Sequence, residues 1–379
     1  MEETAPQFSV ACSCGSSFHL HPSTSILPPL SYVAPTHVLL SGITWTCIVP
    51  SSAIRTFSRA PPPRPDRMLI NLLPDFFAAL QSVDPVAAYH RYFEANRPLL
   101  SAYWHNYVIE PAGPHFQDVV RETVRADRTD LRAMLERTDV VALAKQAEAA
   151  CTELFEIDST VDVVLMAGVG AANAGELVVN GRGVAFVCLE HFTSIANPTT
   201  RGLGLDPELI PMWLAHEIAH AVRYTSPQSR AELRRTISAA GGFYSYWETG
   251  RVATLREHLV NEGLAVQASR LLSPGHAPWE YYGFQRKQYA RVRELEGVLA
   301  RAVSDDLDRA GLGLRLRWLS GGMSDEARTV QRHVLPERAG YYLGAQMVES
   351  AIAEKGIAWA LRAEARELTA SADAAARTA

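Results

Sequence analysis

The sequence predicts an α+β fold, in which a small, mainly antiparallel sheet precedes a mainly helical C-terminal part. Residues 161–190 contain three short runs rich in β-forming residues, whereas almost everything after residue 206 has the apolar spacing of helices. The dipeptide Asn180-Gly181, between the second and third runs, is a strong hairpin signal. Of the 379 residues, 47% are hydrophobic and 20% are charged, so the chain can bury a sizeable core.

Residues 1–67 differ from the rest of the chain. They are rich in Ser, Pro and Thr, show no sustained period, and end in the Pro-rich segment 59–65. We expect this stretch to be a disordered leader. Because Met68 directly precedes the first periodic sequence, it is an alternative start of the chain, and a genuine flexible leader is the other interpretation.

A single domain is expected over residues 68–379, in three parts. Residues 68–157 are predicted to be helical, with Asp84-Pro85 as an N-cap and first-turn pair and a second helix over 139–155. Residues 158–224 hold the sheet and a helix that begins at Asp206-Pro207. The strands are expected at 161–166, 177–179 and 184–189, and the helices of the last part, 225–379, at 228–240, 252–272, 278–303, 337–353 and 356–367.

The composition argues against several classes of partner. The net charge of -5 and the lack of a basic stripe give no support for nucleic-acid binding. No stretch reaches the roughly 18 uninterrupted apolar residues of a transmembrane helix, so no membrane partner is expected. The five cysteines form no disulfide framework, which suits a reducing compartment, and we expect a cytoplasmic protein.

The segment Trp213–Val222 carries the pattern His-Glu-x-x-His. On a helix His216 and His220 project from one face about one turn apart, which is the spacing that two ligands of one tetrahedral zinc ion need. Glu217 lies near the same face and is placed to act as a general base rather than a ligand. The neighbouring residues are apolar, so burying these polar groups would be costly unless they served a site. A core helix with two hydrogen-bonded histidines is the alternative.

A third zinc ligand is expected further along the chain. Glu262 lies in Asn261-Glu262-Gly263-Leu264-Ala265, within an apolar helical stretch, and is the best candidate. The alternative is a glutamate at the edge of a helix. Glu248, Glu257 and His258 are weaker rivals.

These motifs resemble the gluzincin clan of zinc metallopeptidases, which includes thermolysin and aminopeptidase N. In detail they resemble most a family of bacterial proteins predicted to be zinc-dependent proteases. In that family a short sheet precedes the His-Glu-x-x-His helix, a Glu-Gly-Leu-Ala segment carries the third ligand, and a Gly-Tyr-x-x-Gly segment lies near the C-terminus. This chain matches with Val161–Leu189, His216–His220 with Glu262, and Gly340–Gly344, so the resemblance covers roughly residues 80–365.

Two features depart from the gluzincin pattern. Forty-one residues separate His220 from Glu262, considerably more than in the aminopeptidases, so aminopeptidase activity is not transferred. Many gluzincins place an Asp one turn after the Glu ligand to orient a zinc histidine, and that position here is Val266. Glu190, just past the third strand, is a candidate substitute.

The resemblance also implies further roles. The strand Val184–Cys188 would border the cleft and pair with an extended peptide, so Val184 and Phe186 are the expected substrate-binding residues. Tyr341 or Tyr342 would donate a hydrogen bond to the oxyanion, with core packing as the alternative for both. Tyr341 is preferred because it occupies the matching place in the motif.

The sequence and the resemblance together predict a zinc-dependent peptidase with a zincin-like fold. Zn²⁺ is the expected cofactor, Glu217 the general base, and a peptide or protein the substrate. Two rivals remain open at this point: a zinc hydrolase of a non-peptide amide, for which the metal chemistry is the same, and a catalytically inactive binding module. A purely structural zinc site is disfavoured because it needs no Glu217 and usually has four protein ligands.

Overall fold

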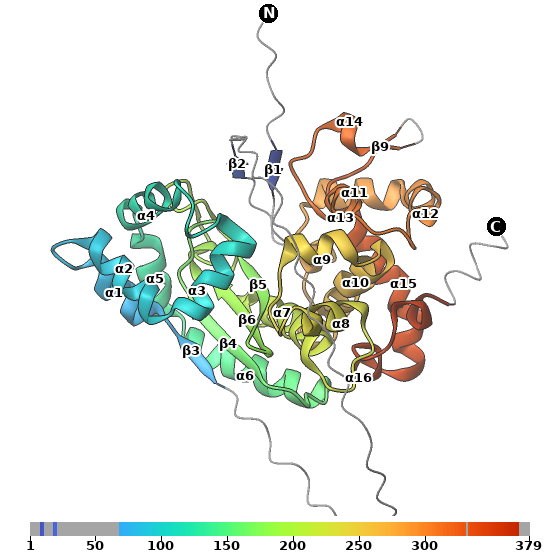
Figure 1. Ribbon diagram of the computed structural model, residues 1–379, viewed down its shortest axis with the longest axis horizontal. Helices are drawn as coiled ribbons and strands as arrows, with labels where there is room; N and C mark the ends of the chain where they lie inside the picture. Colours follow the sequence, from blue (N-terminus) through green and yellow to red (C-terminus); the bar gives the residue numbers. More distant parts are fainter. Residues whose placement is uncertain (1–7, 11–17, 21–67, 331–332, 371–379) are drawn as a thin grey trace, which may run out of the picture.

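The computed structural model describes residues 8–10, 18–20, 68–330 and 333–370. It shows an α+β fold, in which a four-stranded sheet and three two-stranded sheets lie among many helices (Figure 1). The fold class predicted from the sequence is therefore confirmed. The N-terminal part contains β3 (Leu69–Asn71), α1 (Leu73–Leu80), α2 (Pro85–Ala95), α3 (Arg97–Tyr103), the π-helix η1 (Trp104–Val108), α4 (Phe116–Arg125), α5 (Thr129–Arg137) and α6 (Val140–Leu154). The middle part contains β4 (Val161–Met166), β5 (Ala174–Val179), β6 (Arg182–Cys188), η2 (Leu189–His191), β7 (Ala196–Asn197), β8 (Gly202–Leu203), η3 (Pro207–Leu209) and α7 (Ile210–Thr225). The C-terminal part contains α8 (Glu232–Ala239), α9 (Tyr246–Val252), α10 (Leu255–Leu272), η4 (Glu280–Tyr282), α11 (Arg286–Glu294), α12 (Glu296–Ser304), α13 (Leu312–Leu319), α14 (Asp325–Arg328), β9 (Thr329–Val330), β10 (His333–Val334), α15 (Ala339–Lys355) and α16 (Ile357–Ala360).

The leader predicted for residues 1–67 falls mostly outside the described residues. Within it, β1 (Phe8–Val10) and β2 (Phe18–Leu20) pair as two short antiparallel strands. Among the described residues, no helix is long and apolar enough to cross a membrane.

The central sheet is mixed, which corrects the expectation of a mainly antiparallel one. Its four strands lie in the order β3-β4-β6-β5, and the pairings β3–β4 and β4–β6 are parallel. Only β5–β6 is antiparallel, joined at Asn180-Gly181, where both residues have positive φ as a tight hairpin turn requires. The loop from β4 carries the chain past the place of β6 to the far edge of the sheet, so consecutive strands are not all neighbours.

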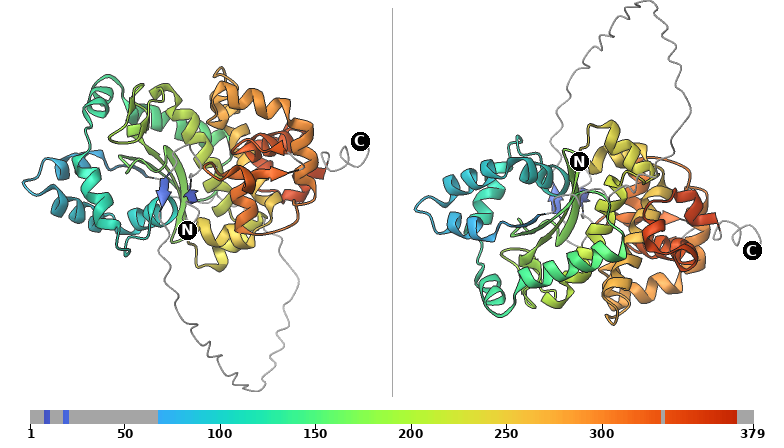
Figure 2. Two further views of the ribbon diagram at one scale, coloured as in Figure 1. Left: turned by 90° about the horizontal axis from the view of Figure 1, so that it is seen from above. Right: turned by 90° about the horizontal axis from the view of Figure 1, so that it is seen from below.

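Both faces of the sheet are covered by helices, and the side chains of β6 show which helices cover which face. A Cβ at Gly183 would lie 3.0 Å from Ala221 of α7, so the odd-numbered positions of β6 face α7. Phe186 lies on the other face, where the rings of Tyr103 and Tyr107 pack against it. Figure 2 shows the first helices of the chain, α1 to α3, and the C-terminal helices on opposite sides of the sheet, whereas α6 packs against α7.

Helix α7 is the central helix of the molecule and lies between the sheet and α10 (Figure 1). Pro211 occupies its first turn, where the missing N–H has no intrahelical partner to lose. Almost every later residue is buried, as expected for a helix that contacts other elements on all sides. The predicted helix over 206–224 is thus confirmed, with a short 3-10 turn, η3, before it.

Helices α10 and α15 cross at very short range because glycines meet there. A Cβ at Gly263 would lie 2.1 Å from the carbonyl carbon of Gly344, and a Cβ at Gly344 would lie 1.9 Å from the carbonyl oxygen of Leu259. Only residues without a side chain permit this approach. It brings Glu262 and Tyr341, on adjoining turns of the two helices, to one region of the core.

The helix expected over 278–303 is three shorter elements, η4, α11 and α12. Gly283 ends η4 in the left-handed region, at φ 60°, and the chain turns before α11. The helices expected at 252–272 and 337–353 correspond to α10 and α15 and are confirmed.

Candidate metal centre

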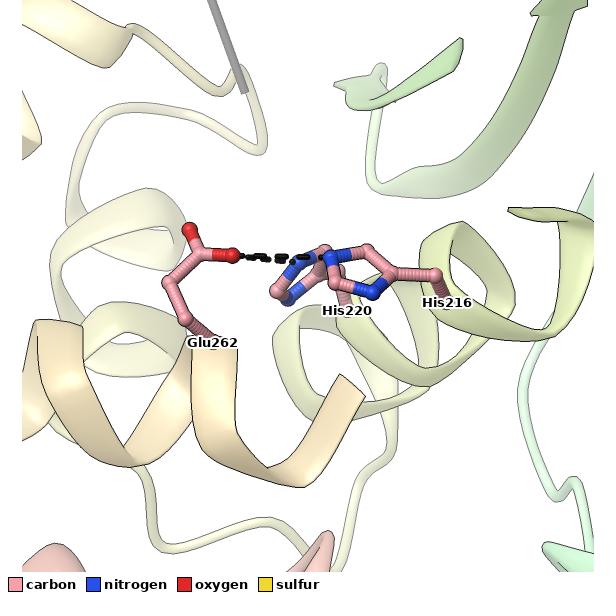
Figure 3. A group of neighbouring side chains, drawn as sticks. All are labelled: His216, His220 and Glu262. Atoms are coloured by element: carbon pink, nitrogen blue, oxygen red, sulfur yellow. Dashed lines mark ion pairs between the residues drawn. The ribbon is translucent and has the colours of Figure 1, made fainter. Parts of the chain in front are cut away.

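Two neighbouring helices bring three potential metal ligands together (Figure 3). His216 and His220 come from successive turns of α7, with ring centroids 4.9 Å apart. Glu262 comes from α10, the helix that packs against α7. All three side chains are buried, and their potential ligand atoms lie within 4.8 Å of one another.

The distances between the ligand atoms match those around a tetrahedral zinc ion. Glu262 Oε2 lies 3.5 Å from His216 Nε2 and 3.4 Å from His220 Nε2. With zinc–ligand bonds of about 2.0–2.1 Å and tetrahedral angles, neighbouring ligand atoms are about 3.3 Å apart. These contacts are long for hydrogen bonds, and neither Nε2 has a hydrogen-bond partner among the described residues. The three residues therefore fit a zinc ion, and two His with one Glu is a ligand set of catalytic zinc sites.

The charges of the ligands also suit a cation. Burial raises the pKa of Glu262, but the neighbouring His220 and His216 outweigh it and hold that pKa well below its usual range, so the carboxylate is ionised. Burial lowers the pKa of His216. For His220 burial acts in the same direction, but the negative charges of Glu262 and Glu176 prevail and raise its pKa to about 10. A metal ion competes with this proton for the imidazole.

Glu217 is fully buried and lies beside the ligands without joining their group. One of its carboxylate oxygens lies within 4.8 Å of His220 and of Glu176. Burial first, and then the negative charge of Glu176, raise the pKa of Glu217 well above its usual range. A raised pKa brings a carboxylate closer to the operating range of a general base near neutral pH.

Glu176 on β5 is a member of the site that the sequence analysis missed. It lies on the face of the sheet that is covered by α7, and its carboxylate accepts hydrogen bonds from Tyr107 at 2.7 Å and Tyr224 at 3.2 Å. The amide of Asn261, the residue before Glu262, donates to Tyr224 in turn, at 2.9 Å. A single carboxylate in the buried strand Ala174–Val179 was a usable signal, because burying such a group is costly without partners.

The rival ligands are placed elsewhere. Glu257 forms a buried ion pair with Arg223 at 2.9 Å, Glu248 pairs with Arg251 at the surface, and the Nε2 of His258 lies 3.3 Å from the carbonyl oxygen of Thr249. Glu190 accepts hydrogen bonds from the main-chain N–H groups of residues 168 and 170, so the idea that it orients a zinc histidine is wrong. The Nδ1 atoms of His216 and His220 have no hydrogen-bond partner among the described residues.

The two tyrosines of the Gly-Tyr-x-x-Gly segment point to different places. The ring of Tyr341 is stacked near that of His216, with centroids 6.4 Å apart, and lines the same small cavity as Glu262. Tyr342 donates a hydrogen bond to Glu296 instead and packs on Tyr282. Of the two, only Tyr341 is in a position to assist chemistry at the metal centre.

The expectation that Val184 and Phe186 bind substrate along a free strand edge is wrong. Strand β6 pairs with β4 on one side and β5 on the other, so it has no free edge. Both side chains are buried on the face opposite α7. The edge of the sheet nearest the metal centre belongs to β5. Its outward main-chain groups already form hydrogen bonds with other parts of the chain. The Tyr107 hydroxyl accepts a hydrogen bond from the Glu176 N–H, and the Val178 carbonyl accepts one from the Tyr244 N–H.

A clasp, formed by residues 104–108 of η1 and residues 244–247, closes over this edge. The side chain of Asn106 donates to the Tyr244 carbonyl at 3.2 Å and accepts from the Tyr246 N–H at 2.7 Å. The indole of Trp247 donates to the carbonyl of His105. The cavity enclosed at the metal centre measures only about 10 Å³, which is room for about one water molecule.

Comparison with known proteins agrees with a zinc site. A family model described as "Predicted Zn-dependent protease (DUF2268)" matches residues 244–370, about a third of the chain. No curated protein and no solved structure matches. The matched stretch contains Glu262 and Tyr341, whereas the helix with His216 and His220 precedes it. The C-terminal part of the chain is therefore similar to a family of predicted zinc-dependent proteases. His216 and His220 lie outside the matched stretch, and the fold brings them beside Glu262.

Proposed function

We propose that this chain is a zinc-dependent peptidase that hydrolyses peptide bonds. The observation that carries the proposal is the meeting of His216, His220 and Glu262 at tetrahedral spacing, with the buried carboxylate of Glu217 beside them. A structural zinc site is usually closed by four protein ligands and has no use for an adjacent carboxylate of this kind. The family similarity of residues 244–370 points in the same direction.

The three ligands would hold the zinc ion and leave one coordination position for chemistry. Zinc in such a site supplies Lewis acidity, which polarises a carbonyl oxygen and makes a water molecule easier to deprotonate. The negative charge of Glu262 suits this role, and both histidines would bind the metal as neutral imidazoles, His220 after giving up its proton.

Glu217 would move the proton during hydrolysis. As the water oxygen forms its bond to the carbonyl carbon, the carboxylate accepts the water proton, and it then passes that proton to the leaving nitrogen as the C–N bond breaks. Tyr341, whose ring is stacked near His216, would donate a hydrogen bond to the oxygen on which negative charge develops. Arg338, stacked 4.5 Å from the centre of the Tyr341 ring, adds positive charge behind it.

An extended peptide is the substrate that the surroundings suit best. The outward edge of β5 passes the metal centre, and its main-chain groups at Glu176 and Val178 are of the kind that pair with a peptide strand. The hydroxyl of Tyr107 and the N–H of Tyr244 occupy these groups in the closed form. Substrate binding would replace these contacts as the clasp opens.

The test measures zinc content and peptide cleavage by the full-length chain and by Glu217→Gln. We expect about one zinc per chain in both proteins. Loss of the general base should slow the cleavage of a broad peptide library by about a hundredfold or more. Glu248→Gln, at an exposed surface ion pair, is the matched control and should behave like the parent.

Equal cleavage rates for Glu217→Gln and the parent would refute the proposed role of this carboxylate. A zinc-loaded parent that cleaves no peptide but hydrolyses small non-peptide amides would move the function to that class. A chain that binds no zinc at all would refute the site itself.

A further inference from the structure

A cavity of about 600 Å³, the arginine-lined cavity, lies between α4 and the turn that joins β7 to β8. Its wall comes from residues 118–128, from residue 169 in the loop after β4, and from residues 198–201. The volume is within the usual range of small-molecule pockets. Among the described residues, none lines both this cavity and the small one at the metal centre, so the two are separate features of the fold.

The arginine-lined cavity is positively charged in a protein whose net charge is -5. Four arginines and two acidic residues line it, which leaves an excess of two positive charges. Two of the arginines have partners in the wall, because Arg121 pairs with Asp118 at 3.2 Å and Arg201 pairs with Glu122 at 3.3 Å. The excess charge therefore belongs to the other two arginines.

These two, Arg125 and Arg128, form no ion pair with any residue that the structure describes. Arg125 is exposed at the end of α4. Arg128 is only 5% exposed, and its guanidinium lies 4.9 Å from the centre of the Phe76 ring. It donates one hydrogen bond to the carbonyl of Gly168, at 3.2 Å, whereas its Nε and Nη1 have no partner within the described part of the chain.

A buried guanidinium without a carboxylate is costly, because the loss of hydration is not offset by an opposite charge. Glu190, a buried acid beside the same loop, accepts hydrogen bonds from the N–H groups of Gly168 and Gly170 and forms no ion pair with Arg128. Charges interact more strongly near the protein interior than in bulk water. The charge of Arg128 therefore favours an anion in the cavity that this residue lines.

A phosphate group matches the excess charge better than a carboxylate does. A phosphate ester carries about two negative charges near neutral pH, whereas a carboxylate carries one. Guanidinium groups also bind phosphate oxygens with paired hydrogen bonds. The cavity is larger than a phosphate ion, and Val119, Ala126, Val169 and Pro198 make part of its wall apolar. An organic group attached to the phosphate would cover this part of the wall.

We propose that the arginine-lined cavity binds a small organic phosphate, with the phosphate group held by Arg125 and Arg128. The proposal adds a ligand site to the N-terminal part of the chain. It does not depend on the proposed peptidase activity, because no residue of the metal centre takes part in it.

The first experiment measures binding to the full-length protein at pH 7.5 by titration calorimetry. The probes are phenyl phosphate, benzoate, phenol and inorganic phosphate, all at one ionic strength, because salt screens exposed charges. We expect phenyl phosphate to bind about tenfold tighter or more than benzoate, because it brings a second negative charge. Inorganic phosphate should bind more weakly than phenyl phosphate because it buries no apolar surface. Phenol, which is uncharged, should show no binding.

The second experiment repeats the phenyl phosphate titration with variants. Arg125→Gln changes an exposed residue and should weaken binding by about tenfold or more. Arg128→Met should also weaken binding, and Arg128→Lys, which keeps the positive charge, should weaken it less. Arg293→Gln, the same change at an exposed arginine of α11, is the matched control and should leave the affinity unchanged. Thermal melting of each variant shows that it is folded.

Phenyl phosphate binding that is unchanged in both Arg125→Gln and Arg128→Met would overturn the proposal. So would binding that is lost in Glu262→Gln but kept in Arg125→Gln, since the phosphate would then be bound at the metal centre. Benzoate binding as tight as that of phenyl phosphate would show that the cavity does not select phosphate. Equal affinities for inorganic and phenyl phosphate would show that the organic group makes no contact.

Discussion

Replacing Glu262 by Gln tests the third zinc ligand most directly. Gln keeps the size of the side chain but removes the negative charge from the ligand set. The carboxylate is buried and ionised between the two histidines, with its Oε2 at 3.4 and 3.5 Å from their Nε2 atoms. Losing an outer hydrogen-bond partner of a zinc ligand lowers metal affinity by about 10–100-fold, so losing the charge of a direct ligand should weaken binding by at least the upper end of that range.

The loss of affinity translates into a loss of zinc-dependent stability. At a fixed, saturating concentration of free zinc, a hundredfold weaker site stabilises the folded chain by about 2.7 kcal/mol less. For a domain of this size, that corresponds to a fall of about 5 °C in the zinc-dependent rise of the melting temperature. The rise is measured by calorimetry as the difference between zinc-loaded and chelator-treated protein, so any effect of the substitution on the metal-free chain cancels.

Glu248→Gln is the control, because it makes the same change at a surface ion pair on the neighbouring helix α9. It should leave the zinc-dependent rise unchanged. If Glu262→Gln shows the full rise of the parent, Glu262 is not a ligand, and the site would have to be assigned to another set of residues.

Three further predictions follow from the surroundings of the site. Gly263→Ala places a Cβ 2.1 Å from the main chain of Gly344 and should lower the free energy of unfolding, measured in urea, by about 3 kcal/mol. Gly313→Ala, whose Cβ meets nothing within 4 Å, is the control and should leave it unchanged. Equal stabilities of the two variants would contradict the close helix crossing. Tyr107→Phe removes the hydroxyl that occupies the edge of β5, and should lower the free energy of unfolding by about 1–3 kcal/mol. Because the edge is then free for a peptide, KM for peptides should fall. An unchanged KM would show that this edge does not bind substrate. The pKa of His220 is raised to about 10, so zinc must displace its proton at pH 7.5. Calorimetry in buffers of different ionisation heat should show release of about one proton per zinc, and the zinc affinity should fall as the pH is lowered. Zero net proton release would argue against His220 as a ligand.

The sequence alone was sufficient for features that depend on local spacing. The histidines four residues apart, with a glutamate between them and apolar neighbours, predict a buried helix that carries a metal motif, and α7 has these properties. Asn180-Gly181 predicts the β5–β6 hairpin because only a few residue types tolerate two successive positive φ angles. The carboxylate of Glu262 in an apolar helix indicates a candidate third ligand, because burial of a charge is costly without a partner, and the structure brings it beside the two histidines.

Tertiary structure alone decided the strand order and everything that depends on it. A β-rich run in the sequence indicates a buried strand. It does not indicate which strand lies beside it, because strand pairing joins residues far apart in the chain. The peptide-binding role that the resemblance implies for Val184–Cys188 needs β6 at an edge, whereas its pairing with β4 and β5 places β6 inside the sheet and β5 at the edge. Glu176 reaches the metal centre only through that order.

The choice between adjacent tyrosines and the arginine-lined cavity depend on tertiary packing in the same way. The motif favours Tyr341 over Tyr342 only by its place after Gly340. The crossing of α15 over α10 at two glycines turns Tyr341 towards His216 and Tyr342 towards Glu296. The arginine-lined cavity is assembled from residues between 118 and 201, none of which carries a local signal of its own. Helix periodicity is set by neighbours three or four residues away, whereas a binding site is set by which distant segments the core brings into contact.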